Sequence, residues 1–186
     1  ELAMGSDIFI KHLIGYGVIG YSNDKYYFNI EVVEKYLKEA QKYKSINLTD
    51  DQKREEVNSR RDALENWLRQ VIRNQLHAKY GKKGAIKQVR NSLPESRKMV
   101  TDGLDIAQIF GNIDCPLYFN ELTSILMREW DLFQQIFGMD QHNLRAILDD
   151  INSTRNDAHA KVFSKHDFEL LRIRFETLDQ IQNDWA

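Results

Sequence analysis

Residues 64–72 read Leu-Glu-Asn-Trp-Leu-Arg-Gln-Val-Ile, with apolar side chains at the first, fourth, fifth, eighth and ninth positions. Apolar residues that recur at i, i+3, i+4 and i+7 predict a helix with one buried face. Upstream, Thr49 and Gln52 have the spacing of a capping box, which predicts the start of this helix. We expect it to end at Gly81 as a C-cap and to be followed by a shorter helix over 85–93.

Similar patterns predict that the chain beyond these helices is also helical. A wide apolar face covers 117–137, and the i, i+3, i+4, i+7 pattern returns between 141 and 151. Ser164 and Asp167 form a second capping-box spacing before an apolar stripe that favours a last helix. Only the stretch over 95–116 is less regular. The sequence therefore predicts an antiparallel helical bundle.

The start of the chain has a different pattern. Aromatic and β-branched residues at 18–21 and 26–28 flank turn residues at 22–25, which predicts a β-hairpin. A short helix over 7–14 precedes it, and an amphipathic helix over 30–44 follows. This arrangement resembles the wing of a winged-helix domain; the alternative is a hairpin added to a helical domain. The expected fold class is all-α, an antiparallel helical bundle with a small N-terminal β-hairpin.

These patterns divide the chain into three segments. Residues 1–6 resemble a cloning scar and are left out of the fold prediction. Residues 7–46 hold the hairpin and its two helices, and residues 47–186 form the helical domain. The scar suggests a piece of a longer protein, so we expect an upstream domain of the same protein as one partner.

Composition excludes several classes of protein. The single Cys115 rules out a disulfide framework and a site made of several cysteines, and favours a reducing, cytoplasmic location. No apolar run reaches the ~18 residues of a membrane span. The sequence has no phosphate-binding Gly-rich loop, nucleophile elbow or zinc-protease motif, so we expect neither a cofactor nor a metal.

Two other features have simple interpretations. The carboxylate pairs Glu55-Glu56 and Asp149-Asp150 are expected to be solvated charges, because neighbouring residues on a helix point about 100° apart. Cys115 has no histidine near it in the sequence and is expected to be inert.

A basic segment lies within the near-neutral total of 26 Lys plus Arg against 28 Asp plus Glu. Between residues 73 and 98 the only acid is Glu95, and a local basic face of this kind attracts phosphates. The alternative is an ordinary solvated surface. The candidate RNA-binding residues are Lys79, Lys82, Lys83, Lys87 and Arg90.

A second candidate site is the polar segment 152–160 that follows the apolar pattern at 141–151. On a helical wheel extended through this segment, Arg155 falls inside the apolar arc and His159 on its edge. A guanidinium there needs an anion or a polar cleft, and the i, i+4 spacing makes the two side chains neighbours. Arginine can bind a phosphate while histidine moves a proton. Alternatively, Arg155 pairs with a carboxylate of another helix and His159 simply ends its own.

The segment Arg-Asn-Asp-Ala-His at 155–159 resembles the signature of the HEPN superfamily, in which an Arg-Asn opening is followed shortly by His. Residues 63–72 resemble the opening long helix of the branch found in a eukaryotic RNA endoribonuclease and in bacterial defence proteins. Residues 118–122, with Trp130 and Phe133, resemble its middle helix. The resemblance covers roughly residues 49–185.

This resemblance implies a homodimer whose twofold axis brings two Arg-His pairs into one cleft, and metal-independent RNA cleavage in a defence-related protein. Arg155 would bind the phosphate, His159 would act as general acid or base, Asn156 would orient them, and Glu65 would support the arginine. Three residues separate Arg155 from His159, fewer than is usual in the family.

A second hypothesis is a non-catalytic helical module that dimerises or docks on an upstream NTPase or winged-helix region. DNA binding through the hairpin is a third, less favoured one, because the hairpin tip offers only Lys25 as a cation.

Overall fold

The computed structural model describes residues 8–45, 47–111, 115–154 and 163–185. The chain forms two compact units, Glu1–Leu48 (unit 1) and Thr49–Ala186 (unit 2). Most described residues are helical, and the only sheet among them is a two-stranded antiparallel hairpin near the N-terminus. The predicted fold class, an all-α bundle with a small N-terminal hairpin, is therefore confirmed.

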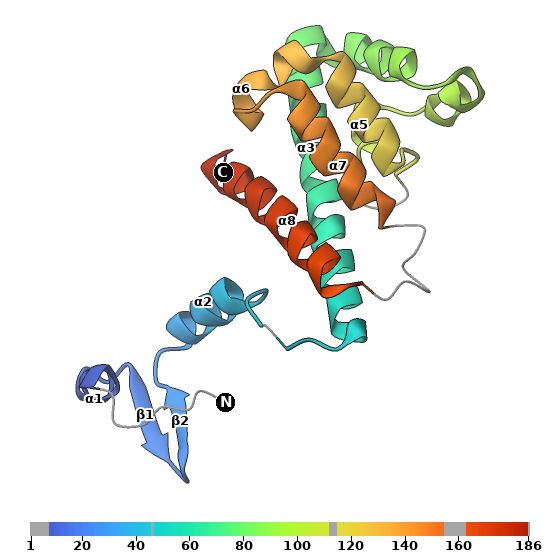
Figure 1. Cartoon of the computed structure of the whole chain (residues 1–186). Helices are drawn as coiled ribbons and strands as arrows, with labels where there is room; N and C mark the ends of the chain where they lie inside the picture. Colours follow the sequence, from blue (N-terminus) through green and yellow to red (C-terminus); the bar gives the residue numbers. More distant parts are fainter. Residues whose placement is uncertain (1–7, 46, 112–114, 155–162, 186) are drawn as a thin grey trace. The chain divides into compact units, whose positions relative to one another are not determined.

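Unit 1 consists of two short helices around a hairpin (Figure 1). Its elements are α1 (Ile8–Gly15), β1 (Ile19–Ser22), β2 (Lys25–Phe28) and α2 (Glu31–Gln41). The strands are joined by Asn23 and Asp24, which both have positive φ (50° and 60°), as a two-residue type I′ turn requires. The hairpin predicted from this turn and its flanking aromatics is thus present.

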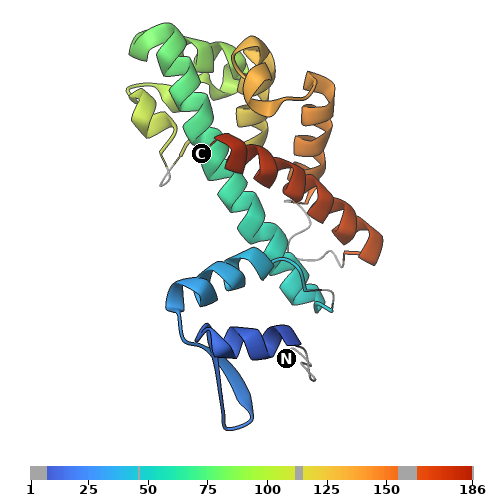
Figure 2. The same cartoon turned by 90° about the vertical axis from the view of Figure 1, so that its left-hand side faces the viewer.

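Unit 2 is organised around one long helix, α3 (Asp50–Ser92), which runs through the unit in Figures 1 and 2. Both hydrogen bonds of the predicted capping box are present: Gln52 N donates to Thr49 Oγ1, and Thr49 N donates to Gln52 Oε1. The helix is kinked at Gly81, whose φ of 64° and ψ of 176° are not helical. The predicted interruption at Gly81 is therefore real, and a second helical segment follows it directly.

Seven further elements follow α3 in the chain. They are η1 (Glu95–Thr101), α4 (Ile106–Ile109), α5 (Phe119–Arg128), η2 (Trp130–Leu132), α6 (Gln134–Phe137), α7 (Gln141–Ser153) and α8 (Lys165–Trp185). Helices α4, α5 and α8 pack on α3, while α7 packs on α5 and α8. The helix predicted at the second capping box is confirmed, because Asp167 N donates to Ser164 Oγ at the start of α8.

The single helix expected over 117–137 is wrong. The chain leaves the α-helix after Arg128, forms the 3-10 turn η2 and resumes as α6. Contacts from distant residues favour this break: Gln141 Nε2 donates to the carbonyl of Met127 at 2.5 Å, and Tyr80 Oη donates to Glu129 at 2.7 Å. Carbonyls at a helix end need such partners, and the local apolar periodicity contains no sign of them.

The core of unit 2 lies between α3, α5 and α8. The apolar stripe predicted on α3 is buried along its length, and the largest fully buried side chains come from α3, from the segment that runs from α4 to the start of α6, and from α8. They include Leu68, Ile72, Leu76, Ile109, Phe110, Leu117, Phe119, Leu122, Ile125, Leu126, Phe133 and Phe175. On one side of α3, Trp67 meets Phe137 edge-on at 5.6 Å between ring centroids, and Trp130 stacks on the same ring at 6.3 Å.

A buried ion cluster joins α3 to α8. Arg172 donates from Nε to Glu56 Oε1 at 2.7 Å and from its terminal nitrogen to Oε2, and Arg60 donates to Asp179 at 2.5 Å. Both guanidiniums also lie over phenylalanine rings of α8, Phe168 and Phe175. The expectation that Glu56 is a solvated charge is wrong, since only 7% of it is exposed. Its neighbour Glu55 is exposed.

The conformation of Gly81 generates a first prediction. Only glycine adopts its φ and ψ without strain, so Gly81→Ala should lower the free energy of unfolding by about 1–3 kcal/mol. Gln70→Ala, at an exposed position of the regular part of α3, is the control and should change it by less than about 0.5 kcal/mol. Urea unfolding followed by tryptophan fluorescence measures both, and equal effects would contradict the strained conformation.

The ion cluster generates a second prediction. Glu56→Gln removes the carboxylate that Arg172 binds and that lies 3.6 Å from Arg60, and should destabilise unit 2 by about 3 kcal/mol. Asp150→Asn is the matched control: it breaks the more exposed pair with Arg174 (3.2 Å) on the same helix α8 and should cost less than about 1 kcal/mol. The double variant Glu56→Gln/Arg172→Met should regain part of the loss. Equal losses in Glu56→Gln and Asp150→Asn would contradict a buried pair.

Candidate nucleic-acid interface

The Arg-His motif follows directly after α7. The apolar face predicted for this helix is confirmed, because Leu144, Ile147, Leu148 and Ile151 are all buried. Helix α7 ends at Ser153 with Thr154 as its C-cap, and the Thr154 hydroxyl donates to the carbonyl of Ile151 at 2.7 Å. Arg155, Asn156 and His159 lie outside the described residues. The wheel that made Arg155 and His159 neighbours extends beyond the described helix, so their placement stays a prediction.

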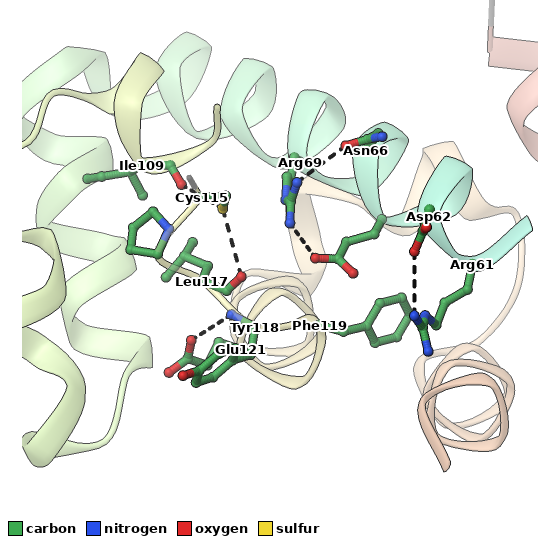
Figure 3. A network of polar contacts seen from close by, with 12 residues as sticks. Arg61, Asp62, Asn66, Arg69, Ile109, Cys115, Leu117, Tyr118, Phe119 and Glu121 are labelled. Carbon is green, nitrogen blue, oxygen red and sulfur yellow. Dashed lines mark hydrogen bonds and ion pairs between the residues drawn. The ribbon is translucent and has the colours of Figure 1, made fainter. Parts of the chain in front are cut away.

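The fourth candidate, Glu65, lies on α3 in a half-buried row of alternating charges. Its carboxylate accepts from Arg69, one turn along the helix, and Arg69 also donates to Asn66 Oδ1 at 3.3 Å. Figure 3 shows Arg69 and Asn66 on the same helix, with Cys115 to the left of Arg69. Glu65 is therefore already paired within its own helix, and the predicted support of Arg155 by Glu65 stays a prediction.

Arg61 continues this row one turn before Glu65. Its nearest carboxylate is that of the adjacent Asp62, at 3.5 Å, and one of its terminal nitrogens is buried without a hydrogen-bond partner. A buried guanidinium nitrogen without an acceptor is unusual in a folded protein. Nothing in the sequence distinguishes Arg61 from the other arginines of α3.

The basic segment separates into paired and unpaired cations. Lys79, Lys82, Lys83 and Lys87 are exposed on α3, and within the described residues none of them forms a salt bridge. Arg90, the fifth candidate, pairs with Asp102. The structure thus brings four of the five predicted RNA-binding residues to one end of α3, around the kink at Gly81.

Two further basic residues of the segment, Arg97 and Lys98, have structural contacts. Arg97 forms a two-pronged pair with Glu121 (2.8 and 3.1 Å), donates to the carbonyl of Pro116 at 2.6 Å and stacks on Tyr118. It therefore fixes the start of α5. Lys98 pairs with Glu95 at 2.6 Å, and this hydrogen bond lowers the pKa of the Glu95 carboxyl.

An acidic residue also approaches the kinked part of α3. Tyr80, next to Lys79, donates to Glu129 from the turn that follows α5, and this hydrogen bond raises the pKa of the tyrosine. The contact ties the helix to the rest of unit 2 immediately before Gly81. The unpaired lysines are therefore held on a fixed part of the fold.

Cys115 lies half-buried at the start of the segment that leads to α5. Its thiol contacts the carbonyl of Ile109 at 3.1 Å, and burial raises the pKa of the thiol. These contacts agree with the expectation that Cys115 is inert.

Among the described residues no group of three or more His, Cys, Asp or Glu side chains is arranged to hold a metal ion. None of the described helices combines the length and the apolar character needed to cross a membrane.

Comparison with known proteins leaves the family undetermined. No protein-family model matches this sequence, and no curated protein or solved structure is significantly similar to it. The resemblance to the HEPN superfamily therefore stays a prediction from its short motif and helix order.

The environment of Cys115 generates a third prediction. Because its raised pKa lowers the thiolate fraction, iodoacetamide should alkylate the folded protein at pH 8 at least about tenfold more slowly than the urea-unfolded protein. The difference should narrow as the pH rises toward the folded pKa, where the thiolate forms in both states. Intact-mass measurement reads the reaction directly, since the chain has one cysteine. Equal rates at pH 8 would contradict a buried thiol.

Proposed function

We propose that unit 2 is a HEPN-type RNA-binding domain that cleaves RNA without a metal, with Arg155 and His159 at the reacting phosphate. The observation that carries the proposal is the group of four exposed lysines at the kinked end of α3, Lys79, Lys82, Lys83 and Lys87, for which the described residues provide no carboxylate partner. We call this group the lysine face.

The distribution of ion pairs around the lysine face supports a polyanionic ligand. Arg90, Arg97 and Lys98 lie in the same basic segment, and each has a carboxylate partner. Apart from Arg73, which contacts Asn74 at 3.5 Å, the unpaired charges are thus concentrated between residues 79 and 87. Since the second segment of α3 starts after Gly81, the positive end of its dipole adds to the potential near Lys82 and Lys83. Phosphates respond to such a local potential even when the net charge is −2.

The proposed chemistry follows from the side chains of the motif. The planar guanidinium of Arg155 can donate two hydrogen bonds to a phosphate and offset the charge that develops on it. Histidine ordinarily titrates near neutral pH, so the imidazole of His159 is proposed to accept the proton of a ribose 2′-hydroxyl or donate one to the leaving 5′-oxygen. Attack of the 2′-oxygen on the adjacent phosphorus then forms one P–O bond, breaks another and leaves a 2′,3′-cyclic phosphate. Asn156 is proposed to orient these groups.

RNA binding is tested first, with a fluorescent single-stranded RNA and anisotropy. Lys82→Ala/Lys83→Ala should weaken binding about tenfold at 0.1 M salt and reduce the salt slope by about two. The matched control is Lys98→Ala/Lys165→Ala, which removes two lysines that already pair with glutamates. The control should change affinity little, and equal weakening in both variants would contradict a specific lysine face.

Cleavage is tested separately, in EDTA and in preparations free of contaminating nuclease. Arg155→Ala and His159→Ala should each lower the cleavage rate at least about 100-fold while RNA affinity changes far less, because the lysine face is intact. The products of the unchanged protein should end in cyclic phosphates. Unaltered cleavage in both variants would rule out this site.

A second candidate function is a docking module without chemistry. It is favoured by the large apolar side chains that unit 1 exposes, among them Tyr16, Val32 and Tyr36. Such a module predicts that no RNA is bound or turned over. The anisotropy experiment therefore distinguishes the two functions.

A further inference from the structure

The helix that carries the lysine face exposes no phenol or indole ring on which a base could stack. Apart from its histidine, α3 has two residues with aromatic rings, Trp67 and Tyr80. Trp67 belongs to the core, with 7% of its surface exposed. None of the large apolar side chains that the described residues expose lies on α3. Proteins that hold single-stranded nucleic acids usually combine basic residues with exposed rings of this kind.

Tyr80 is the aromatic residue nearest to the lysines in the chain, and its contacts hold it within the fold. Its hydroxyl donates to Glu129 at 2.7 Å. At its other end the side chain packs against the backbone of Gly84, where an added Cβ would lie only 2.8 Å from the Cβ of Tyr80. A side chain held at both ends is not free to turn outward and stack on a base.

The other side chains that could read a base lie elsewhere or are already paired. His77 is exposed, but it precedes Lys79 by two residues, and side chains two apart on a helix point about 160° away from each other. Guanidiniums read guanine edges, yet Arg90 and Arg97 are both held in ion pairs with carboxylates. The lysine face therefore lacks the groups by which proteins usually recognise bases.

The lysines can instead bind the sugar–phosphate backbone. An ammonium group is a point charge, and contacts with phosphates carry no sequence information. A double helix offers about one negative charge per 1.7 Å of its axis, against about one per 3.4 Å for each strand. It is also rigid before it binds, whereas a single strand has to be ordered on the protein at an entropic cost that no stacking contact offsets here.

We propose that the lysine face binds double-stranded RNA in preference to single strands, through the backbone phosphates and without reading the base sequence. This inference rests on the proposed function and names the kind of RNA that the face takes. The major groove of an RNA double helix is too deep and narrow for side chains to read, which leaves the phosphates as the groups that the lysines reach.

Fluorescence anisotropy on the full chain tests the preference, with a labelled single-stranded RNA of about 20 nucleotides, the same strand annealed to its complement, and a second such set with shuffled sequence. At 0.1 M salt each duplex should bind at least about fivefold more tightly than its single strand, and the two duplexes should agree within about twofold. Lys82→Ala/Lys83→Ala should weaken duplex binding about tenfold. His77→Ala is the control on the same helix and should change affinity less than about twofold.

The possible failures separate this inference from the proposed function. Single strands that bind as tightly as the duplexes, or duplex affinities that differ more than about tenfold between the two sequences, would overturn the inference and leave RNA binding by the lysine face in place. Weaker binding in His77→Ala than in Lys82→Ala/Lys83→Ala would overturn it too, because a ring and not the backbone charges would then hold the RNA. If neither kind of RNA binds, the proposed function fails with it.

Discussion

Burial of one apolar stripe along α3 is the constraint on which unit 2 depends. The stripe runs from Val57 to Val89, and α4, α5 and α8 all pack on α3. Because a single helix provides the contact surface for elements distant in sequence, its start and its change of direction have to be fixed. The capping box at Thr49 fixes the start, and Gly81 fixes the change of direction. Apolar contacts between α3 and α8 do not by themselves fix how the two helices are aligned. The buried ion pair of Glu56 with Arg172 does, because its hydrogen bonds are directional.

The parts of this fold that could be predicted from the sequence are those set by local chemistry. The caps at Thr49 and Ser164 and the turn at Asn23 and Asp24 each depend on residues a few positions apart. The break between α5 and α6 depends on Gln141 and Tyr80, which are distant in sequence from the carbonyl and carboxylate they bind. Burial of Glu56 likewise depends on α8, and the i, i+1 argument that treated it as solvated considered its own helix only.

The residues of the candidate site also divide into features that local sequence predicts and features that depend on distant segments. Exposure of the lysines on α3 follows from their place beside a buried stripe, and it could be predicted. Which cations form ion pairs could not be predicted, because Arg90 and Arg97 pair with carboxylates on later segments of the chain. Arg97 binds Glu121 and stacks on Tyr118. It therefore positions α5 and is not counted among the ligand-binding residues. The Arg155–His159 motif belongs to the sequence prediction alone.

The aromatic contacts of α3 have a practical consequence for spectroscopy. All three tryptophans, Trp67, Trp130 and Trp185, belong to unit 2, and two of them share the ring of Phe137. Unit 1 contains tyrosines instead. Indole emission therefore reports the integrity of the bundle and is silent on the hairpin. A chain whose N-terminal part has melted would still show a native emission spectrum, so that part has to be followed through a different chromophore or through amide exchange.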